Sequence, residues 1–296
     1  MYNISKQLSD DLWRATLLIL CPPAFAARLL VMVVRVFSRE ADMTSLAIAK
    51  AQALGAPEGY QTFLEYESTN GMPDVVFATF DERALYQRAH SPLARAFVQA
   101  SEVAVLMSLD ENDPAPVDLL AQRARLGTSS VSRRLRSLAE AVVLVERVGR
   151  FGWRRLGPFP GLLRAVTAIE LKLRDWRKAL DQAARYRSFA ERSLVVVDSD
   201  RSTRARANAV AFQFNGIGLA SLSACGELEQ VVAAPDAPPF DEVARVVAGE
   251  RLWARDSLQR RAVRSSSGRS ARHQGDLLNR PEARGRDDSR RAQAHP

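Results

Sequence analysis

Histidine and cysteine are scarce in this chain of 296 residues. Two of the three histidines, His273 and His295, lie near the C-terminus, and His90 is the only histidine in the rest of the sequence. The two cysteines, Cys21 and Cys225, are too far apart in sequence to form a metal-ligand pair. These absences argue against a disulfide scaffold, a histidine-based zinc site and Ser-His-Asp catalysis.

Lysine is also rare. Only four of the 42 basic residues are lysine, and the other 38 are arginine. Because arginine cannot replace lysine where a compact ammonium group is needed, each lysine is a candidate for a chemical role. The four are Lys6, Lys50, Lys172 and Lys178.

Positive charge is concentrated at the end of the chain. Residues 256–296 carry ten arginines and five acidic residues, which leaves +3 of the net charge of +8 for residues 1–255. The segment 256–296 is rich in Ser, Arg, Gly, Ala and Asp and has few apolar residues, so we expect a disordered basic tail. The whole chain is 47% hydrophobic and 26% charged, which is typical of a folded protein.

No hydrophobic run is long enough to span a membrane. Within the apolar stretch 12–37, the longest uncharged run, Ala15–Ala27, has 13 residues, whereas a spanning helix needs about 20. Asp10 and Asp11 precede it, which is wrong for a signal peptide. We interpret residues 12–37 as two helices packed on a core, with attachment to a membrane surface as the alternative. The expectation is a cytoplasmic protein without a membrane partner.

Residues 60–80 predict a β-hairpin. Apolar and polar residues alternate over 60–68, Asn70-Gly71 is a strong turn signal, and 73–80 form a second apolar run.

Residues 92–157 show a different pattern: a helix over 93–107, a short helix over 117–124, a tight turn, a further helix and then two short strands. This order resembles the winged helix-turn-helix DNA-binding domains of bacterial regulators, in which the second helix of the motif enters the major groove. The resemblance implies contacts with double-stranded DNA from a serine- and arginine-rich face, although a winged helix used only for protein contacts is the alternative. The residues expected on the DNA are Ser129, Ser130, Ser132, Arg133, Arg134 and Arg136, with Arg147, Arg150 and Arg154 in the wing.

From residue 165 onward, predicted strands and helices alternate, which indicates an α/β arrangement. The predicted elements include strands over 165–173, 194–197 and 217–222 and a helix over 202–213. Glu170 and Lys172 lie two apart on the first of these strands and therefore share one face. Gln182 and Tyr186 lie four apart on the helix that follows, so that they also share a face. The alternative is an exposed strand with an ordinary Glu/Lys pair.

These residues resemble the core of the PD-(D/E)xK, or restriction-endonuclease-like, nuclease superfamily. The resemblance implies that an acidic residue holds Mg²⁺ and that a lysine orients water and offsets the charge of the phosphate. It also requires an aspartate on a preceding strand, and Pro73-Asp74 in the hairpin is the nearest candidate. Glu65 or Glu67 is a candidate for a further carboxylate, while the alternative places Asp74 in an unrelated N-terminal domain.

We therefore expect an α/β (α+β) fold with a restriction-endonuclease-like mixed sheet flanked by helices and interrupted by a winged helix-turn-helix domain. The expected function is DNA binding with Mg²⁺-dependent phosphodiester cleavage, in which Asp74 and Glu170 bind the metal and Lys172 and Gln182 complete the site. One alternative is a transcriptional regulator whose nuclease-like domain is catalytically silent and serves either to form a homodimer or to sense a ligand. Another alternative is a protein-interaction module of a defence or mobile-element system. The expected parts are 1–91 (N-terminal helices and first half of the core), 92–157 (winged helix), 158–255 (second half of the core) and 256–296 (tail).

Overall fold

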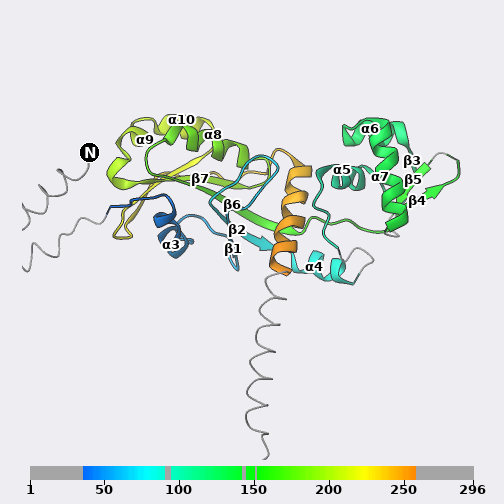
Figure 1. Cartoon of the computed structure of the whole chain (residues 1–296), viewed down its shortest axis with the longest axis horizontal. Coiled ribbons are helices and arrows are strands. Elements are labelled where there is room, and N and C mark those ends of the chain that lie inside the picture. Colours follow the sequence, from blue (N-terminus) through cyan, green and yellow to red (C-terminus); the bar gives the residue numbers. More distant parts are fainter. Residues whose placement is uncertain (1–35, 91–94, 142–144, 151, 258–296) are drawn as a thin grey trace, which may run out of the picture. The chain divides into compact units, whose positions relative to one another are not determined.

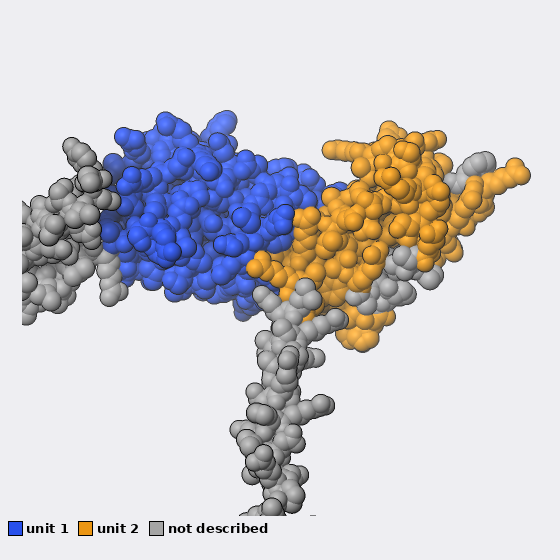
Figure 2. Space-filling view, viewed as in Figure 1, with its two compact units in different colours: residues 1–80, 163–245 blue, residues 81–162, 246–296 orange. Residues whose placement is uncertain are grey.

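The computed structural model describes residues 36–90, 95–141, 145–150 and 152–257. The helices expected over 12–37 and the tail expected over 256–296 lie almost entirely outside these residues. The chain divides into two compact units, which Figure 2 shows in different colours. Unit 1 comprises residues 1–80 and 163–245, and unit 2 comprises residues 81–162 and 246–296.

Unit 1 is a mixed α/β unit built on a sheet of six strands. Its strand order is β1-β2-β6-β7-β8-β9. The β6/β7 and β7/β8 pairs are parallel, whereas the other three pairs are antiparallel. The strands are β1 (Gln61–Leu64), β2 (Val75–Phe80), β6 (Leu163–Lys172), β7 (Arg192–Asp198), β8 (Gly218–Leu222) and β9 (Leu228–Val232).

Helices flank both faces of this sheet, as expected from the sequence. One face is covered by α8 (Trp176–Tyr186), α9 (Thr203–Ala207) and α10 (Ala209–Phe214), and α3 (Ala41–Ala49) lies on the other (Figure 1). This burial on both faces explains why β7 is an almost continuous apolar run in its sequence, Arg-Ser-Leu-Val-Val-Val-Asp. The mixed α/β fold class is confirmed in this respect.

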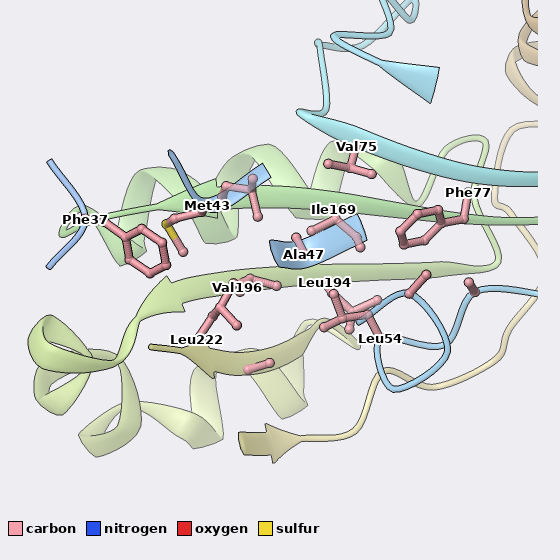
Figure 3. Packing of buried hydrophobic residues seen from close by; sticks show 14 residues of the cluster. Phe37, Met43, Ala47, Leu54, Val75, Phe77, Ile169, Leu194, Val196 and Leu222 are labelled. Carbon is pink, nitrogen blue, oxygen red and sulfur yellow. The ribbon is translucent and has the colours of Figure 1, made fainter. Parts of the chain in front are cut away.

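The core of unit 1 on the α3 side consists of alternate residues from the central strands. Met43 and Ala47 of α3 pack against Ile169 of β6 and Val196 of β7, and Phe77 of β2 extends the cluster (Figure 3). Since neighbouring residues of a strand point to opposite faces, Glu170 and Lys172 are directed to the other side, where α8 lies.

The hairpin is present, with shorter strands than expected. Leu64 pairs with Val75, and the segment between them folds back through a bridge between Ser68 and Gly71. Glu65 has a φ of 47°, which ends β1 at Leu64 because a left-handed residue cannot continue a strand.

The described residues of unit 2 form several helices and a small antiparallel sheet with strand order β3-β5-β4. Leu106, Leu120 and Leu135 come from three helices that contact one another, and each of these side chains is fully buried. A further helix covers residues 242–257, and the boundary between the units falls within it, after Arg245. The elements are α4 (Glu82–Ala89), α5 (Ala100–Ser108), β3 (Ala115–Pro116), α6 (Val117–Ala124), α7 (Thr128–Ala141), β4 (Val145–Val148) and β5 (Gly152–Arg155).

A buried ion pair links α4 to the last helix within unit 2. Arg88 and Glu250 are both fully buried, and their Nη2 and Oε1 atoms are 2.6 Å apart. The second carboxylate oxygen of Glu250 accepts the N–H of Phe97 at 2.9 Å, and the Arg88 guanidinium lies over the Phe97 and Phe159 rings. These contacts explain why residues 246–257 group with unit 2, whereas we expected all of 158–255 to complete the nuclease-like core.

Two expected helices differ from the observed ones. The helix expected over 93–107 begins only at Ala100, and the helix expected over 202–213 is divided at Asn208 into α9 and α10. Among the described residues, no helix is both long and apolar enough to cross a membrane.

Candidate active site

Glu170 and Lys172 form an ion pair at the carboxyl end of β6. Oε1 of Glu170 lies 2.9 Å from Nζ of Lys172. The Glu170 side chain is 1% exposed and that of Lys172 is 12% exposed, so water screens this pair weakly. The predicted sharing of one strand face by these two residues therefore produces a direct contact.

Glu40 is the second partner of Lys172. Its Oε2 lies 3.0 Å from Nζ of Lys172, and its Oε1 accepts the N–H of Leu173 at 3.4 Å. Burial lowers the pKa of Lys172, but the hydrogen bonds to Glu170 and Glu40 outweigh this effect and raise it above its ordinary value. Lys172 is therefore a fixed positive charge between two carboxylates.

Asp74 joins this group from the neighbouring strand. Val75 pairs with Ile169 in the antiparallel β2/β6 ladder, so that the next position outward brings Asp74 beside Glu170. Oδ2 of Asp74 accepts the N–H of Leu171 at 2.7 Å. Burial raises the pKa of Asp74 to about 6, and the nearby Glu170 and Glu40 carboxylates add to this rise against the opposing effects of the Leu171 N–H and of Lys172.

Tyr186 supports Glu170 from the helix side. The Tyr186 hydroxyl donates to Oε2 of Glu170 at 2.6 Å, and the ring is fully buried. Burial and the Glu170 carboxylate raise the pKa of Tyr186, which keeps its hydroxyl protonated as a donor. Gly71 of the hairpin lies against the same ring, because a Cβ at Gly71 would be only 3.0 Å from Cε1 of Tyr186.

Gln182 lies one helical turn before Tyr186 on α8. Its Oε1 is buried and has no hydrogen-bond partner among the described residues. The spacing of Gln182 and Tyr186 placed both on the inner face of α8, but only Tyr186 bonds to Glu170. Gln182 thus offers a buried acceptor to a donor that the described residues do not supply.

The further carboxylate does not come from the hairpin. Glu65 and Glu67 are both exposed, and the residue between them, Tyr66, is buried instead. Glu40, which was not predicted from the sequence, provides the third carboxylate. It directly precedes α3, and no motif at Ser38-Arg39-Glu40 signals its pairing with Lys172.

The donors gathered here are three carboxylates and one ammonium group. Within the described ranges, no group of three or more His, Cys, Asp or Glu side chains has an arrangement suited to hold a metal ion. Asp74 and Glu170 nevertheless provide two carboxylates at neighbouring positions of adjacent strands, and the raised pKa of Asp74 reflects mainly its burial, to which the charge of Glu170 adds. Mg²⁺ is commonly held by one or two carboxylates together with water and substrate phosphates, so Asp74 and Glu170 are of the ligand type that this ion uses.

The residues expected to contact DNA lie in unit 2. Val131, Leu135 and Leu138 of α7 are buried, whereas Ser129, Arg133 and Arg136 are exposed and Ser130, Ser132 and Arg134 are half-exposed. In the part of the chain that the structure describes, Arg133 and Arg134 form no ion pair, so α7 presents free positive charge opposite its apolar face.

The two-stranded segment after α7 is only partly available for such contacts. Arg147 and Arg150 are exposed, and the Arg147 guanidinium donates to the carbonyl of Arg150 at 2.6 Å. Arg154, in contrast, is paired with Glu146 across the β4/β5 ladder. The charge of Arg154 is therefore partly compensated within unit 2.

Comparison with protein-family profiles, with curated proteins and with solved structures found no match to this chain.

Proposed function

We propose that this protein binds DNA and cleaves phosphodiester bonds with the help of a divalent metal ion. The observation that carries the proposal is the grouping of Asp74, Glu170 and Lys172, since the segment 81–162 separates Asp74 from the other two in sequence. Two carboxylates and an ammonium group at the end of adjacent strands are the groups that metal-assisted phosphodiester hydrolysis needs. On this proposal, the sheet of unit 1 is a restriction-endonuclease-like core.

Each side chain has a distinct role in the proposed site. Asp74 and Glu170 would hold Mg²⁺, which when bound withdraws charge from the phosphate and lowers the pKa of water. Lys172 orients the attacking water and offsets negative charge on the phosphate oxygens. Tyr186 holds Glu170 in place, and the buried acceptor of Gln182 helps to position a water molecule or the DNA backbone.

Unit 2 would supply the main contacts with duplex DNA as a winged helix-turn-helix domain. Arg125, at the end of α6, has a φ of 52°, which turns the chain sharply into α7. The first residues of α7 carry hydroxyl and guanidinium groups, which suit hydrogen bonds with base edges and phosphates in the major groove.

A second candidate is a regulator whose nuclease-like unit is catalytically silent and serves dimerisation or sensing. One observation favours it: both oxygens of Glu170 are already bonded, to Lys172 and to Tyr186. A carboxylate held in this way is stable without a metal ion.

Incubation of the purified protein with supercoiled plasmid and Mg²⁺ or Mn²⁺ separates the two candidates. We expect nicked or linear plasmid with the parent protein and none with Asp74→Asn or with chelator present. Binding of the duplex without cleavage under any divalent ion would overturn the nuclease proposal and support the silent regulator.

A further inference from the structure

A cluster of positive charge follows directly after the candidate active site in unit 1. Arg174, Arg177 and Lys178 are all exposed and lie within five residues at the start of α8. We call these three residues the α8 patch. Lys178 and Lys172 are two of only four lysines in the chain, so the compact ammonium group is concentrated here.

The cations of the α8 patch have no acidic partner among the described residues. Asp175 lies between them, but its Oδ1 accepts the backbone N–H of Lys178 at 3.1 Å and caps the helix. Elsewhere in unit 1, five arginines do pair with acids. These pairs are Arg39 with Asp42, Arg192 with Asp236, Arg201 with Asp198, Arg206 with Glu229 and Arg245 with Glu191.

The first turn of α8 is held firmly in place. The guanidinium of Arg177 lies over the ring of Trp176, 4.9 Å from its centroid. Trp176 in turn packs against Phe212 of α10, with 5.8 Å between the ring centroids. The positive end of the helix dipole adds to the charge of the patch, so an anionic group is favoured at this position.

The α8 patch adjoins the candidate site through the chain itself. Arg174 follows Lys172 by two residues, so that their Cα atoms are at most about 7 Å apart. A polyanion with a phosphate at Lys172 therefore extends its neighbouring phosphates toward the start of α8.

We infer that the α8 patch binds backbone phosphates of duplex DNA, so that unit 1 holds DNA by contacts of its own in addition to those of α7. The inference rests on the proposed function for the identity of the partner. Because free arginine and lysine side chains release counterions from DNA when they neutralise phosphates, the contacts must appear in the salt dependence of binding.

The test compares two double variants of the full chain that remove the same charges. Arg174→Gln/Lys178→Gln changes the patch, whereas Arg164→Gln/Lys50→Gln removes one arginine and one lysine elsewhere in unit 1. Arg164 is exposed and lies at the opposite end of β6, Lys50 directly follows α3, and neither has an ion pair among the described residues. Affinity for a short blunt-ended duplex is measured by fluorescence anisotropy in chelator over a series of salt concentrations.

We expect the negative slope of log affinity against log salt to become shallower by about 1.8 in the patch variant. This is about 0.9 for each of two phosphates that the variant no longer neutralises. If the affinities converge at 1 M salt, this equals a decrease of about 60-fold at 0.1 M salt. The control variant should keep the parent slope, and both should keep the parent melting temperature because none of the changed side chains is buried or, among the described residues, ion-paired.

An unchanged slope in the patch variant overturns the inference, and so does an equal decrease in both variants, which would reflect net charge alone. Loss of binding to phosphatidylserine vesicles with an unchanged DNA slope would assign the patch to a lipid surface instead. Chelator prevents cleavage, so a protein that never cuts DNA can still pass this test. Failure of the plasmid assay and failure of the inference are thus separate results.

Discussion

Nζ of Lys172 lies 3.0 Å from Oε2 of Glu40, although 132 residues separate the two in sequence. On its other side, the same ammonium group contacts Glu170 at 2.9 Å. With its pKa raised by these two carboxylates, Lys172 keeps its proton at neutral pH and acts as a cation rather than as a base. Any role in catalysis must therefore use its charge and its hydrogen bonds.

Replacement of Lys172 tests this role. Lys172→Ala should abolish metal-dependent cleavage and leave duplex affinity nearly unchanged, because one charge is a small part of the total phosphate contacts. Lys172→Arg keeps the charge but should also be badly impaired, since a planar guanidinium group cannot occupy the place of a compact ammonium group. Plasmid cleavage and duplex binding are measured in parallel.

Lys172→Ala also leaves the buried Glu170 carboxylate with only Tyr186, which should cost about 1–3 kcal/mol of the free energy of unfolding. Urea unfolding of each variant therefore accompanies the activity assay, and Lys50→Ala serves as the matched lysine control. Cleavage at the full rate by a folded Lys172→Ala protein would refute the catalytic role.

The raised pKa of Asp74 predicts a loss of stability as the pH rises. The folded state binds the Asp74 proton up to about pH 6, whereas the ordinary pKa of 3.8 applies to the unfolded chain. The stabilisation that comes from the protonated Asp74 is complete below the pKa of Asp74 in the unfolded chain, and it is lost as the pH rises through the pKa of Asp74 in the folded protein. Asp74→Asn cannot ionise, so it should gain stability relative to the parent between about pH 4 and pH 6.5, by roughly 2 kcal/mol after a discount for partial exposure.

Urea unfolding of both proteins over this pH range measures the difference. If the free energy of unfolding depends on pH in the same way for the parent and for Asp74→Asn, the pKa of the Asp74 carboxyl group is not raised in the folded protein. At pH 7.5, Mg²⁺ should stabilise the parent but not the variant, because a ligand that binds only the folded state raises its stability.

The hydroxyl of Tyr186 should contribute to stability through its bond with Glu170. Tyr186→Phe keeps the ring but removes the donor at 2.6 Å, which should lower the free energy of unfolding by about 1.5–3 kcal/mol, as expected for a hydrogen bond to a charged group. Tyr86→Phe is the control, since Tyr86 is 67% exposed and should tolerate the change. Equal stability of Tyr186→Phe and the parent would argue that the bond between the Tyr186 hydroxyl and Glu170 does not stabilise the folded state.

The DNA-binding role of α7 predicts a specific effect on salt dependence. Arg133→Ala/Arg134→Ala should weaken duplex binding and reduce the salt slope by about 0.9 for each phosphate that the two side chains neutralise in the parent. Arg83→Ala removes an exposed cation of α4 in the same unit and should have no effect. If the affinity and slope of the double variant match those of the parent, the domain serves protein contacts.

Local signals in the sequence were sufficient for most elements of the fold. The helix predicted over 117–124 coincides with α6, and the apolar runs of β6, β7 and β8 lie where they were expected. The position of Asp74 beside the Glu170 strand could also be predicted, because the resemblance to the PD-(D/E)xK superfamily requires an aspartate on a preceding strand and Pro73-Asp74 is the nearest candidate.

The contacts within the candidate site were harder to predict from the sequence. No periodicity links Glu40 to Lys172, since their contact depends on how α3 enters unit 1. The spacing of Gln182 and Tyr186 shows that they share a helix face, but not which of them reaches Glu170. That choice depends on how α8 packs on the sheet, where Trp176 contacts Phe212 and Gly71 lies against the ring of Tyr186.

The antiparallel pairing of β2 with β6 has a consequence for the folding pathway of the protein. Phe80 and Leu163 are direct partners in this ladder, so the pair closes a long loop and carries the entropic penalty of non-local contacts. Within unit 2, however, the N–H of Asp81 donates to the carbonyl of Leu162 at 2.9 Å, which brings the ends of that loop together. If the loop folds first, β2 and β6 meet almost as the arms of a hairpin, and substitutions that destabilise residues 81–162 should slow the formation of the large sheet even though they lie outside it.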